Sequence, residues 1–306
     1  MRISDHRVSA YITAYQDLEA LNTCLQAIQK QTSPVHQIIV VDNSSPSLSI
    51  TTSTPGTLIW RYPQNIGIAG GLHHAIQWAV GQGYDFLWMF DQDSEPQPDC
   101  LEQLLQAYVQ LANQYLIGMV APTPIDPRTQ IIVRPERFIH DRFQGFAPPD
   151  MTQPYECDAP ITSGALLNLA TVEHVSPPDP SLFMDGIDLD HGIRLKRKGF
   201  HNWVVPTASM LHHFGSPIQL EILGQKKVFQ TYSALRYFYI CRNHTWIELK
   251  HSRGIYKITC ILRRIKFIFS STFWILLLDP EQKLSKIAAC IKGTYYGLAN
   301  NLGKTF

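Results

Sequence analysis

The stretch that most constrains the fold runs from Phe86 to Asp99. Its first five residues are all apolar and are bounded by polar ones, which is too short a run for a helix and predicts a strand buried on both faces of a mainly parallel sheet. Asp91 and Asp93 follow directly, at the strand end where open α/β sheets bind ligands. Residues two apart in an extended stretch point to one side, so both carboxylates can reach one cation or one sugar nucleotide. An acidic turn ended by prolines is the alternative on this stretch alone.

The chain before this stretch predicts a strand, a helix and a second strand over residues 8–14, 18–29 and 38–41. Such a βαβ unit brings the loops after its strands to one edge of the sheet. Thr13, Tyr15 and Asp42 lie in those loops. A carboxylate such as Asp42 can bond a ribose hydroxyl or a pyrimidine base there, and it can equally cap a helix or form a turn.

A glycine-rich loop follows a third predicted strand over residues 58–62 and precedes a predicted helix over 72–80. It contains Asn65, Gly67, Gly70 and Gly71. Glycines at a helix N-terminus let backbone amides approach a phosphate. The spacing is not G-x-G-x-x-G and no P-loop lysine follows, which disfavours a dinucleotide dehydrogenase and a P-loop NTPase.

The middle of the chain predicts an acceptor region. Residues 122–160 are rich in Pro, Asp and Arg with little periodicity, which predicts a long active-site loop. The turn at Ser163 and Gly164 either approaches an acceptor or kinks a strand. A short helix is expected over 191–198, with Asp185, Asp188 and Asp190 at its acidic start.

Asp185 and Asp188 act either as helix caps or in catalysis. Asp190 is four residues before Arg194, so these two should pair on the helix surface. His212 and His213 end a further predicted strand over 204–210. A histidine at a strand end, in a chain that already has a D-x-D, is a candidate metal ligand, although such a pair is more often plain polar surface.

The charge of the chain divides it into two predicted regions. Residues 224–306 contain 14 Lys and Arg against 3 Asp and Glu, a net charge of +11, whereas residues 1–223 carry −10. We therefore expect a catalytic domain over 1–223 and a basic helical extension over 224–306. The six cysteines show no C-x-x-C pair, which argues for reduced thiols in the cytoplasm, and the N-terminus shows no secretory signal.

The basic extension contains the strongest amphipathic pattern of the chain, over residues 255–278. An apolar stripe runs from Ile255 to Phe269, with Lys257, Arg263, Arg264 and Lys266 outside it. The uninterrupted apolar segment of this helix, Phe267 to Leu278, is shorter than the ~20 residues that a bilayer span needs. The helix is therefore expected to lie on an anionic membrane surface. Packing on the catalytic domain, or on a second copy in a homo-oligomer, is the alternative.

Taken together, these motifs resemble family 2 glycosyltransferases with the GT-A fold, in particular bacterial rhamnosyltransferases. The matching stretches are 41–45, 65–71, 91–94, 163–164, 188–190, 193–194, 198–200, 212–215, 236–239 and 242–243, so the resemblance covers about residues 8–245. It implies that Asp42 helps to hold the nucleotide base and that Asp91 and Asp93 bind the donor diphosphate through Mg²⁺ or Mn²⁺. Asp188 is the implied general base, although the family often has an acid where this chain has Ile187 and an aromatic residue where it has His191.

The resulting hypothesis is an inverting transferase that moves a sugar, with dTDP-L-rhamnose as the expected donor, to a hydroxyl of a glycan acceptor. Thr13, Tyr15, Asn65 and Gln92 join the donor site, and His212 joins the metal site. The acceptor is expected to be a lipid-linked glycan of a bacterial cell-surface polysaccharide, at the cytoplasmic face of the membrane. Nucleic acid is not an expected partner.

Two other hypotheses remain at this stage. A nucleotidyltransferase would show a basic, glycine-rich triphosphate loop near the first strand, and residues 13–17 offer none. A sugar-nucleotide or glycan binding protein without catalysis would share the same motifs, and only turnover of a donor separates it from an enzyme.

Overall fold

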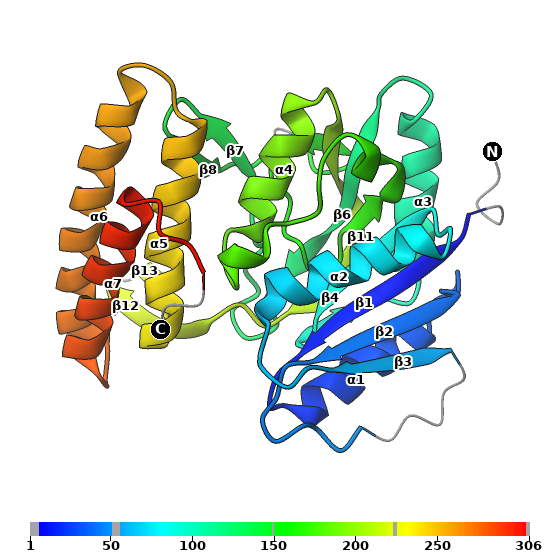
Figure 1. Cartoon of the computed structure of the whole chain (residues 1–306), viewed down its shortest axis with the longest axis horizontal. Helices are drawn as coiled ribbons and strands as arrows, with labels where there is room; N and C mark the ends of the chain where they lie inside the picture. The colour runs from blue at the N-terminus through cyan, green and yellow to red at the C-terminus, as the bar shows by residue number, and fades with distance from the viewer. Residues whose placement is uncertain (1–5, 51–55, 149, 223–224, 304–306) are drawn as a thin grey trace. The chain divides into compact units, whose positions relative to one another are not determined.

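The computed structural model describes residues 6–50, 56–148, 150–222 and 225–303 (Figure 1). The chain forms two compact units. The first unit comprises the chain up to Arg137, residues 145–180 and residues 187–213. The second comprises residues 138–144, residues 181–186 and the chain from Phe214 onward.

The first unit is built on a mixed sheet of nine strands. Its strands are β1 (Val8–Ala14), β2 (Gln37–Asp42), β3 (Thr57–Arg61), β4 (Phe86–Asp91), β5 (Ser94–Pro96), β6 (Ile117–Ile125), β9 (Tyr155–Cys157), β10 (Leu166–Asn168) and β11 (His201–His212). The order is β3-β2-β1-β4-β10-β6-β11-β5, with β9 paired to β11. Strands β3, β2, β1 and β4 are mutually parallel, as are β6 and β11, whereas β10, β5 and β9 run antiparallel to their neighbours. The predicted α/β fold with a mostly parallel sheet is confirmed.

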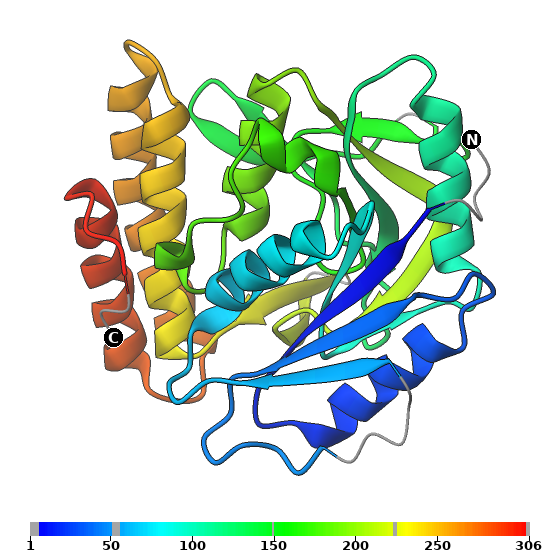
Figure 2. The same ribbon diagram turned by 45° about the vertical axis from the view of Figure 1, so that its right-hand side comes forward.

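Helices cover both faces of the parallel strands (Figure 2). Alternate residues of β1 point to opposite faces, so Ala10 and Ile12 pack with α1 (Leu18–Gln29) and α3 (Cys100–Leu111). On the other face, the Tyr11 hydroxyl lies 3.4 Å from the Ile68 carbonyl oxygen of α2 (Gly67–Gly81). Helix α4 (Ile187–Arg197) packs on β6 and β11, and the 3₁₀ turns η2 (Leu169–Glu173) and η3 (Pro180–Leu182) precede it. Because β4 is enclosed by this packing, its five apolar side chains are all buried, as predicted.

The region 122–160 is more regular than the sequence indicates. Strand β6 continues to Ile125, β7 (Glu136–Ile139) and β8 (Arg142–Gly145) pair as a separate two-stranded sheet, and β9 adds to the main sheet. The prediction of a long irregular loop was therefore wrong for these strands. Strands of three or four residues carry too little alternation to stand out in a stretch rich in Pro and Asp.

Three helices and a hairpin make up most of the second unit. They are α5 (Ala234–His251), α6 (Tyr256–Leu278), α7 (Lys283–Leu298) and the antiparallel pair β12 (Ser216–Ile222) and β13 (Gln225–Thr231). The helices lie side by side (Figures 1 and 2). Helix α7 approaches α5 at Gly293 and Gly297, where a Cβ atom would clash with the backbone carbonyls of Phe238 and Arg242. Among the described residues, no helix is long and apolar enough to cross a bilayer.

The buried pair Arg242 and Asn243 holds a turn of the second unit. Asn243 Nδ2 donates to the carbonyl oxygens of Leu182, Met184 and Asp185 at 2.9, 2.7 and 2.8 Å. Arg242 donates to the carbonyl of Leu182 at 3.0 Å and to Asn243 Oδ1 at 2.8 Å. The turn needs such support because Asp185 adopts the left-handed region, with φ 65°. The Arg-Asn motif seen in the sequence thus has a structural role.

Helix α6 lies in an orientation that the sequence did not predict. Arg264 is 3% exposed and Arg263 is half-buried, and both contact Glu248 of α5, which is itself 2% exposed. Of the four basic residues expected to face a membrane, Lys257 and Lys266 are the exposed pair. The expectation for Arg263 and Arg264 was wrong, because a buried carboxylate on the neighbouring helix draws them inward.

Candidate active site

The carboxyl ends of the parallel strands bring the predicted donor residues to one edge of the sheet. In the strand register Thr13 lies beside both Val41 and Asp91, and Ala14 lies beside Asp42. The ends of β1 and β2 therefore lie at one edge of the sheet, as predicted for Thr13 and Asp42. This edge is formed by residues that are up to 78 positions apart in the sequence, which only the parallel pairing brings together.

Two carboxylates and one imidazole form a cluster at this edge. Candidate ligand atoms of Asp91, Asp93 and His212 all lie within 4.8 Å of one another. The antiparallel pairing of β11 with β5 carries His212 to this place, because it lies opposite Ser94 in the register. Within the described residues, Asp93 Oδ1 is buried and has no hydrogen-bond partner, and His212 Nδ1 lies 3.4 Å from it.

The chemistry of this cluster fits a divalent cation. Carboxylate oxygens are the preferred ligands of Mg²⁺ and Mn²⁺, and an imidazole is a common ligand of transition-metal ions in general. A buried carboxylate oxygen without a hydrogen-bond donor is costly unless a cation or ordered water satisfies it. Asp91, Asp93 and His212 are thus the residues that would hold such an ion.

Two buried hydroxyls connect the cluster to the sheet. The Asp91 backbone N–H donates to Ser163 Oγ at 3.0 Å, Ser163 Oγ lies 2.6 Å from Ser94 Oγ, and Ser94 Oγ lies 2.9 Å from His212 Nδ1. Ser94 and Ser163 are 0% and 1% exposed. We call this chain of contacts the serine relay. Sequence reasoning did not single out Ser94, although its position directly after the D-x-D was a signal.

The predicted acceptor turn at Ser163 and Gly164 is packed inside the unit. Gly164 has φ +80°, and a Cβ atom there would meet Met210 Sδ at 2.5 Å and Pro122 Cγ at 2.7 Å. The Trp88 indole N–H donates to the Gly164 carbonyl at 2.8 Å. These two residues form a packed turn just before β10, outside any strand, so the alternative of a kink within a strand is not what the structure shows. An acceptor contact by these two residues stays a prediction.

The negative charge of Asp91 and Asp93 contributes to raised pKa values in neighbouring side chains. The Cys24 thiol lies 3.8 Å from the Asp91 carbonyl oxygen, and its pKa is raised well above the usual value, first by burial and then by the charges of Asp93 and Asp91. Burial, and to a smaller extent Asp91, also raises the pKa of Tyr11. The charges of Asp91 and Asp93 thus disfavour a further negative charge on these neighbours, and the same charges would favour a bound cation.

Asp42 is buried at the end of β2 and organises the loop that follows. It is 1% exposed, and its carboxylate accepts hydrogen bonds from the backbone N–H groups of Ser44 at 3.0 Å and Leu48 at 2.8 Å. The Arg61 guanidinium lies 4.0 Å away. The turn-forming alternative is thus present in the structure, and contact with a nucleotide base stays a prediction.

The glycine-rich loop uses its first amides within the protein. The Ile66 N–H donates to Asn43 Oδ1 at 3.1 Å and the Gly67 N–H to Asn65 Oδ1 at 2.8 Å. Helix α2 begins at Gly67, earlier than predicted, and so includes Gly70 and Gly71. Gly71 serves packing, since a Cβ atom there would lie 2.6 Å from the Tyr11 hydroxyl. Phosphate binding by this loop stays a prediction. The internal hydrogen bonds argue against it, because they already occupy the amides of Ile66 and Gly67.

Gln92 joins the first and fourth strands across the candidate site. Its side chain accepts from the Tyr15 N–H at 2.7 Å and donates to the Tyr15 carbonyl at 2.9 Å. The Tyr15 side chain is 51% exposed, and the Thr13 hydroxyl accepts from Asn43 Nδ2 at 3.4 Å. Among the residues predicted to bind the sugar donor, Tyr15 therefore presents its ring to solvent.

The three carboxylates around the start of α4 have different environments. Asp188 is half-buried and accepts from the Leu189 N–H at 2.9 Å. Asp190 pairs with Arg194 at 2.7 Å as predicted, but it is 1% exposed and so lies inside the unit rather than on its surface. Asp185, in the second unit, lies 3.0 Å from Arg236 Nε, and burial raises its pKa although Arg236 opposes the shift. Of the two carboxylates in the first unit, Asp188 and Asp190, Asp188 is the more accessible candidate base.

Comparison with known proteins supports a transferase. Residues 9–156 match the family described as Glycosyl transferase family 2. The chain is 27% identical over 233 residues to galactofuranosyltransferase GlfT1 of Mycolicibacterium smegmatis, covering 71% of this chain and 74% of that protein. GlfT1 of Mycobacterium tuberculosis is 26% identical over 218 residues, covering 68% and 71%.

A solved structure shows the same fold. The crystal structure of GalNAc-T7 with UDP, GalNAc and Mn²⁺ superposes with a TM-score of 0.59 at 13% identity, covering 96% of this chain. The present chain spans 56% of that longer protein. At this identity the likeness is one of fold. The chain thus has a GT-A-like fold and resembles glycosyltransferases of family 2 over residues 9–156.

Proposed function

We propose that the protein is a metal-dependent, inverting glycosyltransferase that moves a sugar from a nucleotide donor to a hydroxyl of a glycan acceptor. The observation that carries this proposal is the cluster of Asp91, Asp93 and His212 at the carboxyl edge of the parallel strands. We keep the division into a catalytic domain over residues 1–223 and an extension over 224–306 as part of the proposal.

The residues divide the work between charge and proton transfer. A divalent cation held by the cluster would offset the negative charge that develops on the leaving nucleoside diphosphate. Asp188 accepts the proton of the acceptor hydroxyl as its oxygen attacks the anomeric carbon from the opposite side. Tyr15, Asp42 and Gln92 orient the donor.

The donor has two candidates. The motifs around Asp42 and Asp91 resemble those of rhamnosyltransferases and favour dTDP-L-rhamnose. The curated relatives are named galactofuranosyltransferases, which supports a nucleotide donor of galactofuranose. For the acceptor we propose a lipid-linked glycan of a bacterial cell-surface polysaccharide, with the enzyme bound peripherally to the cytoplasmic face of the membrane.

Asp188→Asn tests the proposed base. The amide keeps the shape of the side chain but cannot accept a proton, so turnover should fall by about 10²–10⁴-fold while donor affinity stays near that of the wild type. Turnover is measured as nucleoside diphosphate released from a panel of donors, with and without a lipid extract, and donor affinity by calorimetry. Asp188→Glu, which retains a carboxylate, should recover part of the rate.

Two results would contradict the proposal. Wild-type turnover in Asp188→Asn would show that the base lies elsewhere. A wild-type protein that binds a donor of the panel but releases no nucleoside diphosphate with any acceptor fraction would instead support a binding protein without catalysis.

A further inference from the structure

Helix α6 of the second unit presents its apolar side to solvent. Its buried residues are Cys260, Arg264 and Ile275. The exposed apolar residues on the opposite side follow helical spacing, and we call them the α6 outer face: Ile255, Ile258, Leu262, Ile265, Phe269, Phe273 and Leu276. Leu262 is 61% and Phe269 72% exposed. Surface helices of globular proteins ordinarily do the reverse, burying the apolar stripe and exposing the charges.

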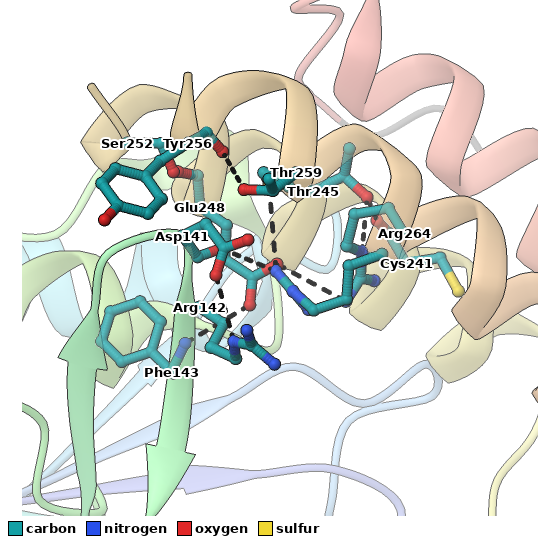
Figure 3. Close-up of polar contacts among 12 residues, drawn as sticks. Asp141, Arg142, Phe143, Cys241, Thr245, Glu248, Ser252, Tyr256, Thr259 and Arg264 are labelled. Carbon is teal, nitrogen blue, oxygen red and sulfur yellow. Dashed lines mark hydrogen bonds and ion pairs between the residues drawn. The ribbon is translucent and has the colours of Figure 1, made fainter. Parts of the chain in front are cut away.

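A buried network fixes this orientation (Figure 3). Glu248 Oε2 of α5 lies 2.5 Å from Arg263 Nη2 and 3.7 Å from Arg264 Nη1. Arg264 Nε donates to Thr245 Oγ1 at 3.0 Å, and Arg263 Nη2 donates to the Asp141 carbonyl at 2.7 Å. Rotating α6 to bury its outer face would leave the Glu248 carboxylate without these partners, which is strongly unfavourable. The outward apolar face is therefore a built feature of the second unit.

The charges around the outer face define what can cover it. Helix α6 contains no Asp or Glu, and its exposed charged residues are Lys257 and Lys266. A second copy of the same face would add further lysines and no acidic residue of α6 to balance them. An anionic lipid surface matches the lysines, and its acyl region accepts the exposed Phe, Leu and Ile side chains.

We propose that the α6 outer face lies in the interfacial layer of an anionic membrane, parallel to its surface. The 23 residues of α6 extend about 35 Å, and the outer face runs along most of that length, as expected for a helix lying in the interface. The inference deepens the proposed function, on which its choice of partner rests, by assigning membrane contact to apolar side chains and two lysines. Arg263 and Arg264 take no part in it.

Co-sedimentation of the full-length protein with vesicles tests this assignment. The vesicles contain phosphatidylglycerol with phosphatidylcholine, or phosphatidylcholine alone, and no sugar donor is present, so the result does not depend on catalysis. We expect binding to the anionic vesicles, and a loss of at least tenfold in the double variant Leu262→Ser and Phe269→Ser. The control is Leu116→Ser, which removes a leucine of matched exposure, 65%, from the first unit.

A second pair of variants tests the electrostatic part without altering apolar surface. Lys257→Gln and Lys266→Gln should each weaken binding to anionic vesicles about fivefold and leave the thermal melting curve unchanged. Undiminished binding of the serine double variant, or no binding of the wild type, would overturn the proposal. A third result would also overturn it: a wild-type protein that is a dimer in light scattering and does not bind vesicles, with a serine double variant that is monomeric. That result would assign the α6 outer face to contact with a second copy.

Discussion

Replacing Ser94 by alanine removes the hydroxyl at the centre of the serine relay. The lost group lies 2.6 Å from Ser163 Oγ and 2.9 Å from His212 Nδ1, and Ser94 is 0% exposed, so water cannot readily take its place. After the change, Asp93 Oδ1 at 3.4 Å is too distant to orient the imidazole firmly. Groups that orient a metal-binding histidine typically contribute 10–100-fold to metal affinity, which corresponds to about 1.4–2.7 kcal/mol.

The affinity for Mn²⁺ is measured by isothermal titration in the presence of a nucleoside diphosphate, without an acceptor, so turnover does not enter the result. We expect the dissociation constant of Ser94→Ala for Mn²⁺ to be about 10–100-fold higher than that of the wild type. Ser9→Ala is the matched control, because Ser9 is equally buried in β1 but its hydroxyl contacts the Phe86 carbonyl at the opposite end of the strands. A Ser94→Ala protein that binds Mn²⁺ as tightly as Ser9→Ala would refute the role of the relay.

Three further outcomes are expected. Chelation with EDTA should abolish transfer and Asp93→Asn should weaken both donor binding and turnover, whereas full activity in EDTA would exclude a metal role. Asn243→Ala should lower the free energy of unfolding by about 3 kcal/mol, since the carbonyls of Met184 and Asp185 lose the Asn243 donor and that of Leu182 keeps only its other donors; an unchanged urea midpoint would contradict this. Burial, with help from a nearby arginine, lowers the pKa of His191 to about 3 from 6.5, so the unfolded state binds an extra proton below pH 6.5 and stability falls as the pH falls. At pH 5 the free energy of unfolding should be about 2 kcal/mol lower for this reason. In urea titrations, the free energy of unfolding of His191→Gln should therefore fall less between pH 7 and pH 5 than that of the wild type. Parallel pH dependences of the two proteins would contradict the lowered pKa of His191.

The elements that the sequence predicted correctly are those whose signal is local. Val8–Ala14 and Leu18–Gln29 were predicted with the bounds that the structure has, and β4 with its acidic end, because an apolar run or a helical period lies within one stretch. The order of these elements also predicted that Thr13, Tyr15 and Asp42 share a sheet edge, since parallel strands leave their carboxyl ends together. The short strands of residues 122–160 carried no such signal.

Contacts between distant residues were decided by the tertiary structure alone. Ser94 and His212 are 118 residues apart, and their contact follows from the antiparallel pairing of β5 with β11, which no local pattern specifies. The sequence also determined that α6 is amphipathic but not which side faces inward, because that depends on Glu248 being buried on the neighbouring helix. Periodicity defines the two sides of a helix, and only the charge of the packed surface, here a buried carboxylate that needs Arg263 and Arg264, determines which side is buried.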